Sequence, residues 1–128
     1  MESENLIVIT GVCASGKTTL SKGLQSLGLN AITVAQEHSV IKNMWNKKNP
    51  EIVIYLDATL QEIKKRKELY WEEKYLESQR QRLAEVRKHS DIYILTDDKS
   101  IEEVLENALL GINRIRGQKN DNTKSNHN

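Results

Sequence analysis

The chain has 128 residues, 38% hydrophobic and 29% charged, which fits one domain large enough to bury a hydrophobic core. The formal net charge of +1 gives no general reason to expect nucleic acid or a membrane surface as a partner. A single cysteine excludes an internal disulfide framework, and because no stretch is apolar over the length of a bilayer, we expect a cytoplasmic protein.

The first predicted element is a short apolar run, residues 6–10, which is typical of a buried parallel strand. Residues 11–18 follow it and read G-V-C-A-S-G-K-T, a complete G-x-x-x-x-G-K-[ST] pattern. The leucine spacing in residues 18–27 predicts a helix, which Gly28 is placed to end. A strand, this loop and a helix in that order predict a phosphate-binding loop.

Such a loop binds phosphates because its glycines let successive backbone N–H groups converge on phosphate oxygens at the start of a helix. Lys17 would reach the β- and γ-phosphates, and the hydroxyl of Thr18 would bind Mg²⁺. We therefore expect ATP or ADP, with Mg²⁺, as cofactors. The cofactor-binding residues would be Gly11, Val12, Cys13, Ala14, Ser15, Gly16, Lys17, Thr18 and Thr19.

Three further apolar runs predict strands, at residues 31–35, 51–56 and 91–95. Between them, we expect a short helix over 40–48 and a long, charged helix over much of 59–89. Ser100 and Glu103 form a capping-box pattern that begins the last helix.

Strands that alternate with helices predict an α/β fold: a parallel sheet of about four strands with helices on both faces, in three layers. We expect a single domain over residues 1–112 and a flexible polar tail over 113–128. In such a sheet the ligand lies at the carboxyl ends of the strands. This rule brings the loop together with the ends of the other three strands, at residues 37–39, 57–59 and 96–99.

Two acids compete at this edge for the metal and acceptor roles. Asp57 ends the run I-V-I-Y-L-D, a pattern that often supplies a metal-binding aspartate, although an aspartate at such a turn is also often structural. Glu37 follows the second strand and could bind the metal or face the acceptor. His38 beside it is either a base near the acceptor or an ordinary surface histidine.

The long helix supplies cations that could close over phosphates. Arg66 and either Arg80 or Arg82 are our candidates, since a guanidinium group suits phosphate oxygens. Most charges of this helix would instead form a solvated face. The helix over 59–89 could also make a homodimer or bind a protein partner.

The order of these motifs resembles the small P-loop kinases, such as nucleoside monophosphate kinases, thymidylate kinase and shikimate kinase. The resemblance covers residues 5–110 and rests on three segments: G-V-C-A-S-G-K-T-T-L, P-E-I-V-I-Y-L-D-A-T-L-Q-E-I-K-K-R and D-I-Y-I-L-T-D-D-K-S-I-E-E-V. It implies the P-loop NTPase fold, with adenine near residues 96–98. Between Ala35 and Glu51 there is no room for the usual acceptor-binding helices, so the chain resembles a reduced member.

Three functions are open at this point. The first is a small kinase that transfers the γ-phosphoryl group of MgATP to a small-molecule acceptor, with Lys17, Glu37, Asp57, Arg66 and Arg80 as catalytic residues. The second is an NTPase that acts as a switch, and the third is a module that senses nucleotide without turnover. The absence of a guanine-reading N-K-x-D pattern favours adenine. The sequence does not identify the acceptor.

Overall fold

The computed structural model describes residues 5–41, 43–67 and 73–126. Its strands form one four-stranded parallel sheet in the order β2-β1-β3-β4. These strands are β1 (Ile7–Gly11), β2 (Ala31–Thr33), β3 (Ile52–Asp57) and β4 (Ile92–Leu95). The predicted parallel α/β fold is therefore confirmed.

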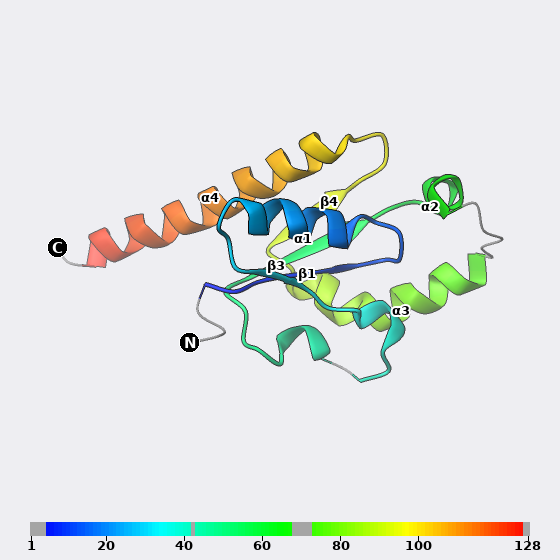
Figure 1. The fold of residues 1–128 in the computed structure, drawn as a ribbon. Coiled ribbons are helices and arrows are strands. Elements are labelled where there is room, and N and C mark those ends of the chain that lie inside the picture. Colours follow the sequence, from blue (N-terminus) through cyan, green and yellow to red (C-terminus); the bar gives the residue numbers. More distant parts are fainter. Residues whose placement is uncertain (1–4, 42, 68–72, 127–128) are drawn as a thin grey trace.

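Helices cover both faces of the sheet in three layers (Figure 1). On one face lie α1 (Lys17–Ser26) and α4 (Ile101–Asn126), and on the other lies α3 (Glu73–His89). A shorter helix, α2 (Leu60–Lys67), follows β3. The long helix expected over 59–89 is thus described as two helices, and residues 68–72 between them lie outside the described part of the chain.

Alternating side chains along the strands divide the core into two clusters. In β1 and β3, Val8, Val53 and Tyr55 pack toward α3, together with Leu83 and Val86 of that helix. Their neighbours along the strands point the other way and pack against α1 and α4; they include Ile7, Ile9, Ile52 and Ile54. Strands buried on both faces explain the continuous apolar runs in the sequence.

The segment after β2 does not form the helix predicted over 40–48. Its described residues contain only two short 3₁₀ helices, η1 (Gln36–His38) and η2 (Met44–Asn46). The amide of Gln36 bonds the carbonyl oxygen of Ile41 (2.9 Å) and the N–H of Trp45 (3.1 Å), so a side chain satisfies groups that a helix would pair. Asn43, at φ 66°, also interrupts helical geometry.

In the described structure α4 continues through the segment expected to be a flexible polar tail (113–128) as far as Asn126, and the flexibility of that segment stays a prediction. Arg116 anchors this part of the helix by donating to the carboxylate of Glu51 (2.9 Å). A helix that is nucleated and packed over its first turns extends at little cost through residues without proline. The capping box at its start is confirmed, since Ser100 and Glu103 exchange hydrogen bonds of 3.1 Å.

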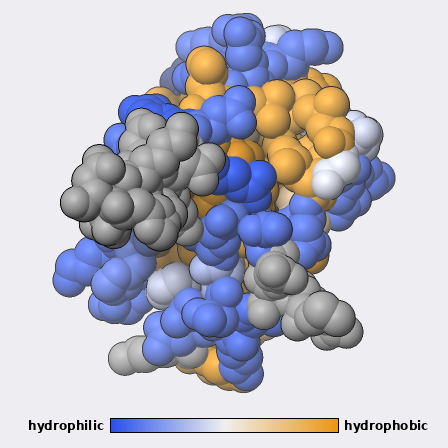
Figure 2. Space-filling view, turned by 90° about the vertical axis from the view of Figure 1, so that its left-hand side faces the viewer, coloured by the Kyte–Doolittle hydropathy of each residue, from blue (hydrophilic) through white to orange (hydrophobic). Residues whose placement is uncertain are grey.

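The start of β1 and the last turns of α4 lie at the end of the molecule opposite the carboxyl ends of the strands (Figure 1). That end is mostly hydrophilic, with apolar side chains gathered on one side of it (Figure 2). None of the helices in the described residues has the length and apolar character that crossing a membrane requires.

Candidate functional site

The G-x-x-x-x-G-K-[ST] segment connects β1 to α1 as a tight loop. At Gly11 a Cβ atom would lie 1.9 Å from the carbonyl oxygen of Leu56, so only glycine allows β1 to end against β3 here. Ala14 (φ 61°) and Gly16 (φ 99°) both take left-handed conformations. No side chain caps the start of α1 at Gly16, which leaves its first N–H groups available for an anion.

Lys17, the first residue of α1, folds back over this loop. Its Nζ donates to the carbonyl oxygens of Gly11 (3.2 Å) and Val12 (3.0 Å), and it forms an ion pair of 2.5 Å with Glu37 Oε2. Thr18 and Thr19 follow in the first turn of α1 and are exposed. The sheet thus brings together the loop lysine and the acid predicted at the end of β2.

The carboxylate of Glu37 is buried, with only 3% of the side chain exposed. Its Oε2 is paired with Lys17, whereas its Oε1 has no hydrogen-bond partner among the described residues. Arg82 of α3 donates to the backbone oxygen of Glu37 (3.2 Å) and fixes this segment against the helix. His38 is half exposed, and its Nε2 lies 3.9 Å from Glu37 Oε2.

Asp57 is equally buried but has a different set of partners. Its Oδ1 accepts hydrogen bonds from the N–H of Ala58 (2.9 Å) and from Arg80 (3.3 Å), and its Oδ2 accepts one from the hydroxyl of Tyr93 (2.6 Å). Burial raises the pKa of Tyr93, and the hydrogen bond to Asp57 raises it further. The described contacts of Asp57 tie β3 to β4 and α3, so its geometry favours the structural alternative, and a metal role stays a prediction.

Arg66 joins the loop to the turn after β4. Its guanidinium donates to the carbonyl oxygen of Ala14 (2.9 Å), and to both the hydroxyl (3.0 Å) and the carbonyl oxygen (2.9 Å) of Thr96. It also lines a pocket of about 240 Å³ between the loop and the start of α4. Leu20, Val104 and Leu105 give this pocket apolar walls. Arg66 and Arg80 therefore lie at different parts of the carboxyl edge, bonded to different strand ends.

Gln79 is a site residue that the sequence analysis missed. It is 1% exposed on the inner face of α3, and its Oε1 accepts a hydrogen bond from the N–H of Cys13 in the loop (3.0 Å). The signal was present in the sequence, because Gln79 is the polar member of a helical stripe with Leu76, Leu83 and Val86. A buried glutamine in an apolar stripe indicates a specific partner.

Four buried side-chain atoms lack a hydrogen-bond partner among the described residues: Ser15 Oγ, Glu37 Oε1, Trp45 Nε1 and Gln79 Nε2. Three of them belong to side chains that are in the loop or bonded to it. Buried polar atoms are normally paired, so these three atoms are candidates for contact with a polar ligand. A hydroxyl, a carboxylate oxygen and an amide N–H together suit a phosphate with its metal ion.

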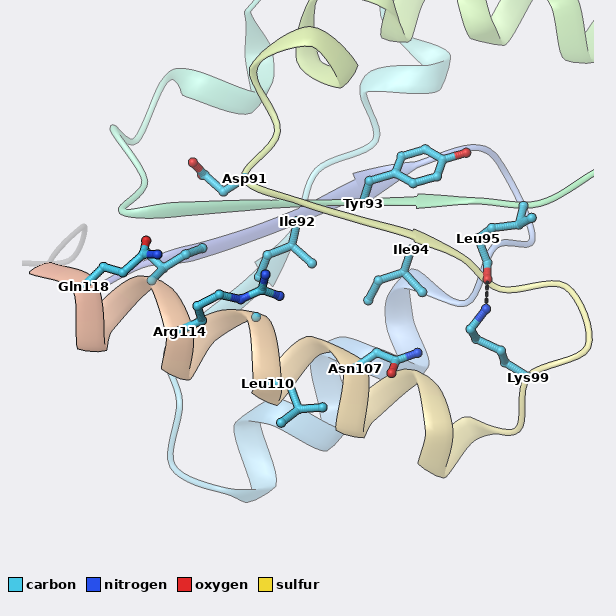
Figure 3. A pocket seen from close by; sticks show the side chains of 12 residues that line it. Asp91, Ile92, Tyr93, Ile94, Leu95, Lys99, Asn107, Leu110, Arg114 and Gln118 are labelled. Carbon is cyan, nitrogen blue, oxygen red and sulfur yellow. Dashed lines mark hydrogen bonds between the residues drawn. The ribbon is translucent and has the colours of Figure 1, made fainter.

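A larger cavity of about 600 Å³ lies elsewhere, between β4 and α4 (Figure 3). Ile92 and Ile94 line it from the strand, and Leu110 and Arg114 line it from the helix. Lys99 donates to the carbonyl oxygen of Leu95 (2.7 Å) at its edge. Because none of its lining residues belongs to the phosphate loop, size does not make it the nucleotide site.

Comparison with known proteins agrees with this assignment. A search of curated proteins gave no match to the chain. The family model of the AAA domain matches residues 7–107, a region that contains the loop, Glu37, Asp57 and Gln79. The chain therefore belongs to this AAA domain family of P-loop NTPases, and it is a nucleotide-binding P-loop protein.

Proposed function

We propose that this protein is a small kinase that transfers the γ-phosphoryl group of MgATP to the hydroxyl of a small-molecule acceptor. The observation that carries the proposal is the buried pair of Lys17 and Glu37 at the phosphate loop, in which one carboxylate oxygen of Glu37 has no hydrogen-bond partner within the described part of the chain. A loop that only binds a nucleoside triphosphate requires the lysine but not the acid. A buried acid with a free oxygen beside that lysine adds a group that can take a proton.

The base and the phosphates of a nucleotide would contact two different parts of this site. The apolar pocket between α1 and the start of α4 suits an adenine ring, and Arg66 borders it. The loop amides and Lys17 would hold the phosphates. For Mg²⁺, the hydroxyl of Thr18 would be a hard oxygen ligand of the kind it prefers, and the ion would neutralise charge on the phosphates.

The chain's own residues then serve the transfer. Lys17 neutralises negative charge on the terminal phosphates, and Arg80, which bonds Asp57 at the carboxyl end of β3, would add a second cation. Glu37 accepts the proton of the acceptor hydroxyl as that oxygen bonds to the γ-phosphorus. The bond from the γ-phosphorus to the bridging oxygen breaks, and ADP leaves with the electron pair.

A second candidate is an NTPase or nucleotide sensor that signals through α3 to a protein partner. It is favoured by the short connection between β2 and β3, whose described residues contain only two 3₁₀ helices and so offer little acceptor-binding structure. In this case α3 is the element that would report nucleotide, because it bonds the loop and the ends of β2 and β3.

Phosphate transfer from ATP, measured alone and then with a panel of nucleosides, nucleotides and small hydroxy acids, separates these functions. The kinase predicts that one acceptor class stimulates ADP formation and becomes phosphorylated. Slow release of phosphate without any acceptor effect would contradict the kinase and support the NTPase. Binding of ATP without turnover would support the sensor.

A further inference from the structure

Gln79 is held on the phosphate loop by one end of its side-chain amide. Its Oε1 accepts the N–H of Cys13 at 3.0 Å, while its Nε2 is buried without a hydrogen-bond partner in the described residues. The contact fixes the orientation of the amide, since a flipped side chain would direct N–H donors at the N–H of Cys13. The unpaired end is therefore a donor.

A buried N–H donor without an acceptor is costly, so its retention calls for an acceptor that arrives with a ligand. The residue is 1% exposed, and the core around α3 gives it apolar neighbours on the same helical face. The acceptor must then come from the side of the loop, where Cys13 lies.

The position of Cys13 indicates which part of a nucleotide this is. The carbonyl oxygens of Gly11 and Val12, directly before it, hold Nζ of Lys17. A P-loop lysine serves the β- and γ-phosphates. The pocket suited to the base is lined by residues from Ala14 onward and by the start of α4, and Gln79 does not line it.

The same helix also reaches the acid at the end of β2. Three residues after Gln79, Arg82 donates to the backbone oxygen of Glu37, which is itself paired with Lys17. Helix α3 thus contacts the loop through Gln79 and the Glu37 segment through Arg82, and Glu37 is in turn paired with Lys17. No other role in the proposed transfer uses the free donor of Gln79.

We propose that Nε2 of Gln79 donates a hydrogen bond to a γ-phosphate oxygen of ATP, and that this contact makes the site prefer ATP over ADP. The inference rests on the proposed function, because it requires the loop to bind nucleotide. Glutamine is suited to this position because its amide can accept a hydrogen bond from the loop at one end and donate one to a ligand at the other.

Isothermal titration calorimetry with MgADP and with the non-hydrolysable β,γ-imido analogue of MgATP tests this directly. Gln79→Glu keeps an acceptor for Cys13 but replaces the donor with an oxygen. We expect affinity for the ATP analogue to fall about tenfold to a hundredfold, with MgADP affinity changed less than about threefold. Gln79→Met, which also removes the donor, should lower the ratio of ATP-analogue to ADP affinity as well.

Gln81→Glu is the matched control, since Gln81 lies on the same helix with an exposed side chain and should leave both affinities as in the parent. Equal affinities for Gln79→Glu and the parent, or equal losses for both nucleotides, would overturn the inference. If the variants do not fold, side-chain amide NMR of the parent replaces them. The Gln79 signals should shift with the ATP analogue and not with MgADP, and identical shifts would overturn it.

Failure of the proposed function would give a different calorimetric result from failure of this inference. A parent protein that binds neither nucleotide would remove the loop assignment and this inference together. A parent that binds both nucleotides, with an unchanged ratio in Gln79→Glu, would remove only the role of Gln79.

Discussion

Two acids lie buried at the carboxyl edge of the sheet, Glu37 after β2 and Asp57 at the end of β3, and their oxygens differ in what they contact. Both oxygens of Asp57 are taken by internal donors: a backbone N–H, Arg80 and Tyr93. Glu37 has one oxygen on Lys17 and one without a partner in the described residues. Their positions in the sequence alone make the two acids equal candidates for a role in the site.

The difference teaches how to separate a structural acid from a reactive one. A carboxylate whose two oxygens both accept hydrogen bonds from the protein itself is fully paired without a ligand, which indicates a structural role. A buried carboxylate with a free oxygen depends on a nearby cation for its stability and keeps one oxygen available for a ligand. We therefore propose that Glu37 serves turnover and that Asp57 serves stability, and mutating each acid should affect a different measurement.

The largest effect should follow from Glu37→Gln. The amide keeps the shape of the side chain but cannot accept the proton of the acceptor, so turnover should fall by about 10²–10⁴-fold. Nucleotide affinity should stay close to that of the parent. Steady-state turnover with the acceptor found in the panel, and calorimetry with MgADP, measure the two effects.

Glu85→Gln is the control, because Glu85 is an exposed acid on α3 that lies 3.6 Å from Nε2 of His89. It should leave turnover unchanged. If Glu37→Gln turned over acceptor as fast as this control, Glu37 would have no part in the chemistry.

A smaller effect, on stability, should follow from Asp57→Asn. The variant weakens the contacts to Arg80 and Tyr93 in a buried setting, and we expect the free energy of unfolding to fall by about 1–3 kcal/mol. Urea denaturation of parent and variant measures this difference. Turnover per folded molecule should change much less than in Glu37→Gln, and a reversed order of the two effects would invert our assignment of roles.

Tyr93→Phe tests the same cluster with a smaller change, the removal of one hydroxyl group. Removing the hydroxyl leaves Oδ2 of Asp57 without that donor, at a cost of about 1 kcal/mol near neutral pH. The folded protein raises the pKa of Tyr93 above 10.0, so its contribution to stability is complete below pH 10 and is lost as the pH rises through the folded pKa.

The stability difference between parent and Tyr93→Phe should therefore shrink above pH 10. Urea denaturation at pH 7 and at pH values above 10 checks this. A difference that grew with pH would mean that the hydroxyl does not donate to Asp57.

The parts of this site that sequence reasoning found are those that depend on local pattern. The loop from Gly11 to Thr18 is contiguous, and its context of strand and helix is visible in the same short segment. Glu37 could be predicted as a site residue because the carboxyl ends of parallel strands share one edge of the sheet.

The parts that it missed depend on long-range packing. The bond from Cys13 to Gln79 spans 66 positions of the chain, and the bond from Tyr93 to Asp57 needs the register of β3 and β4. Neither the rotation of α3 nor that register follows from composition. In the segment after β2, the apolar spacing predicted a helix, but Gln36 satisfied the backbone through its side chain instead.

The most direct test of the account is nucleotide binding by the parent and by Lys17→Ala, measured by calorimetry with MgATP and MgADP. Lys17→Ala removes the cation that the loop holds against Gly11, Val12 and Glu37, so affinity should fall by about a hundredfold or more. Lys22→Ala, an exposed lysine of α1, should bind like the parent. Equal affinity in Lys17→Ala and the parent would contradict the assignment of this loop as the phosphate site.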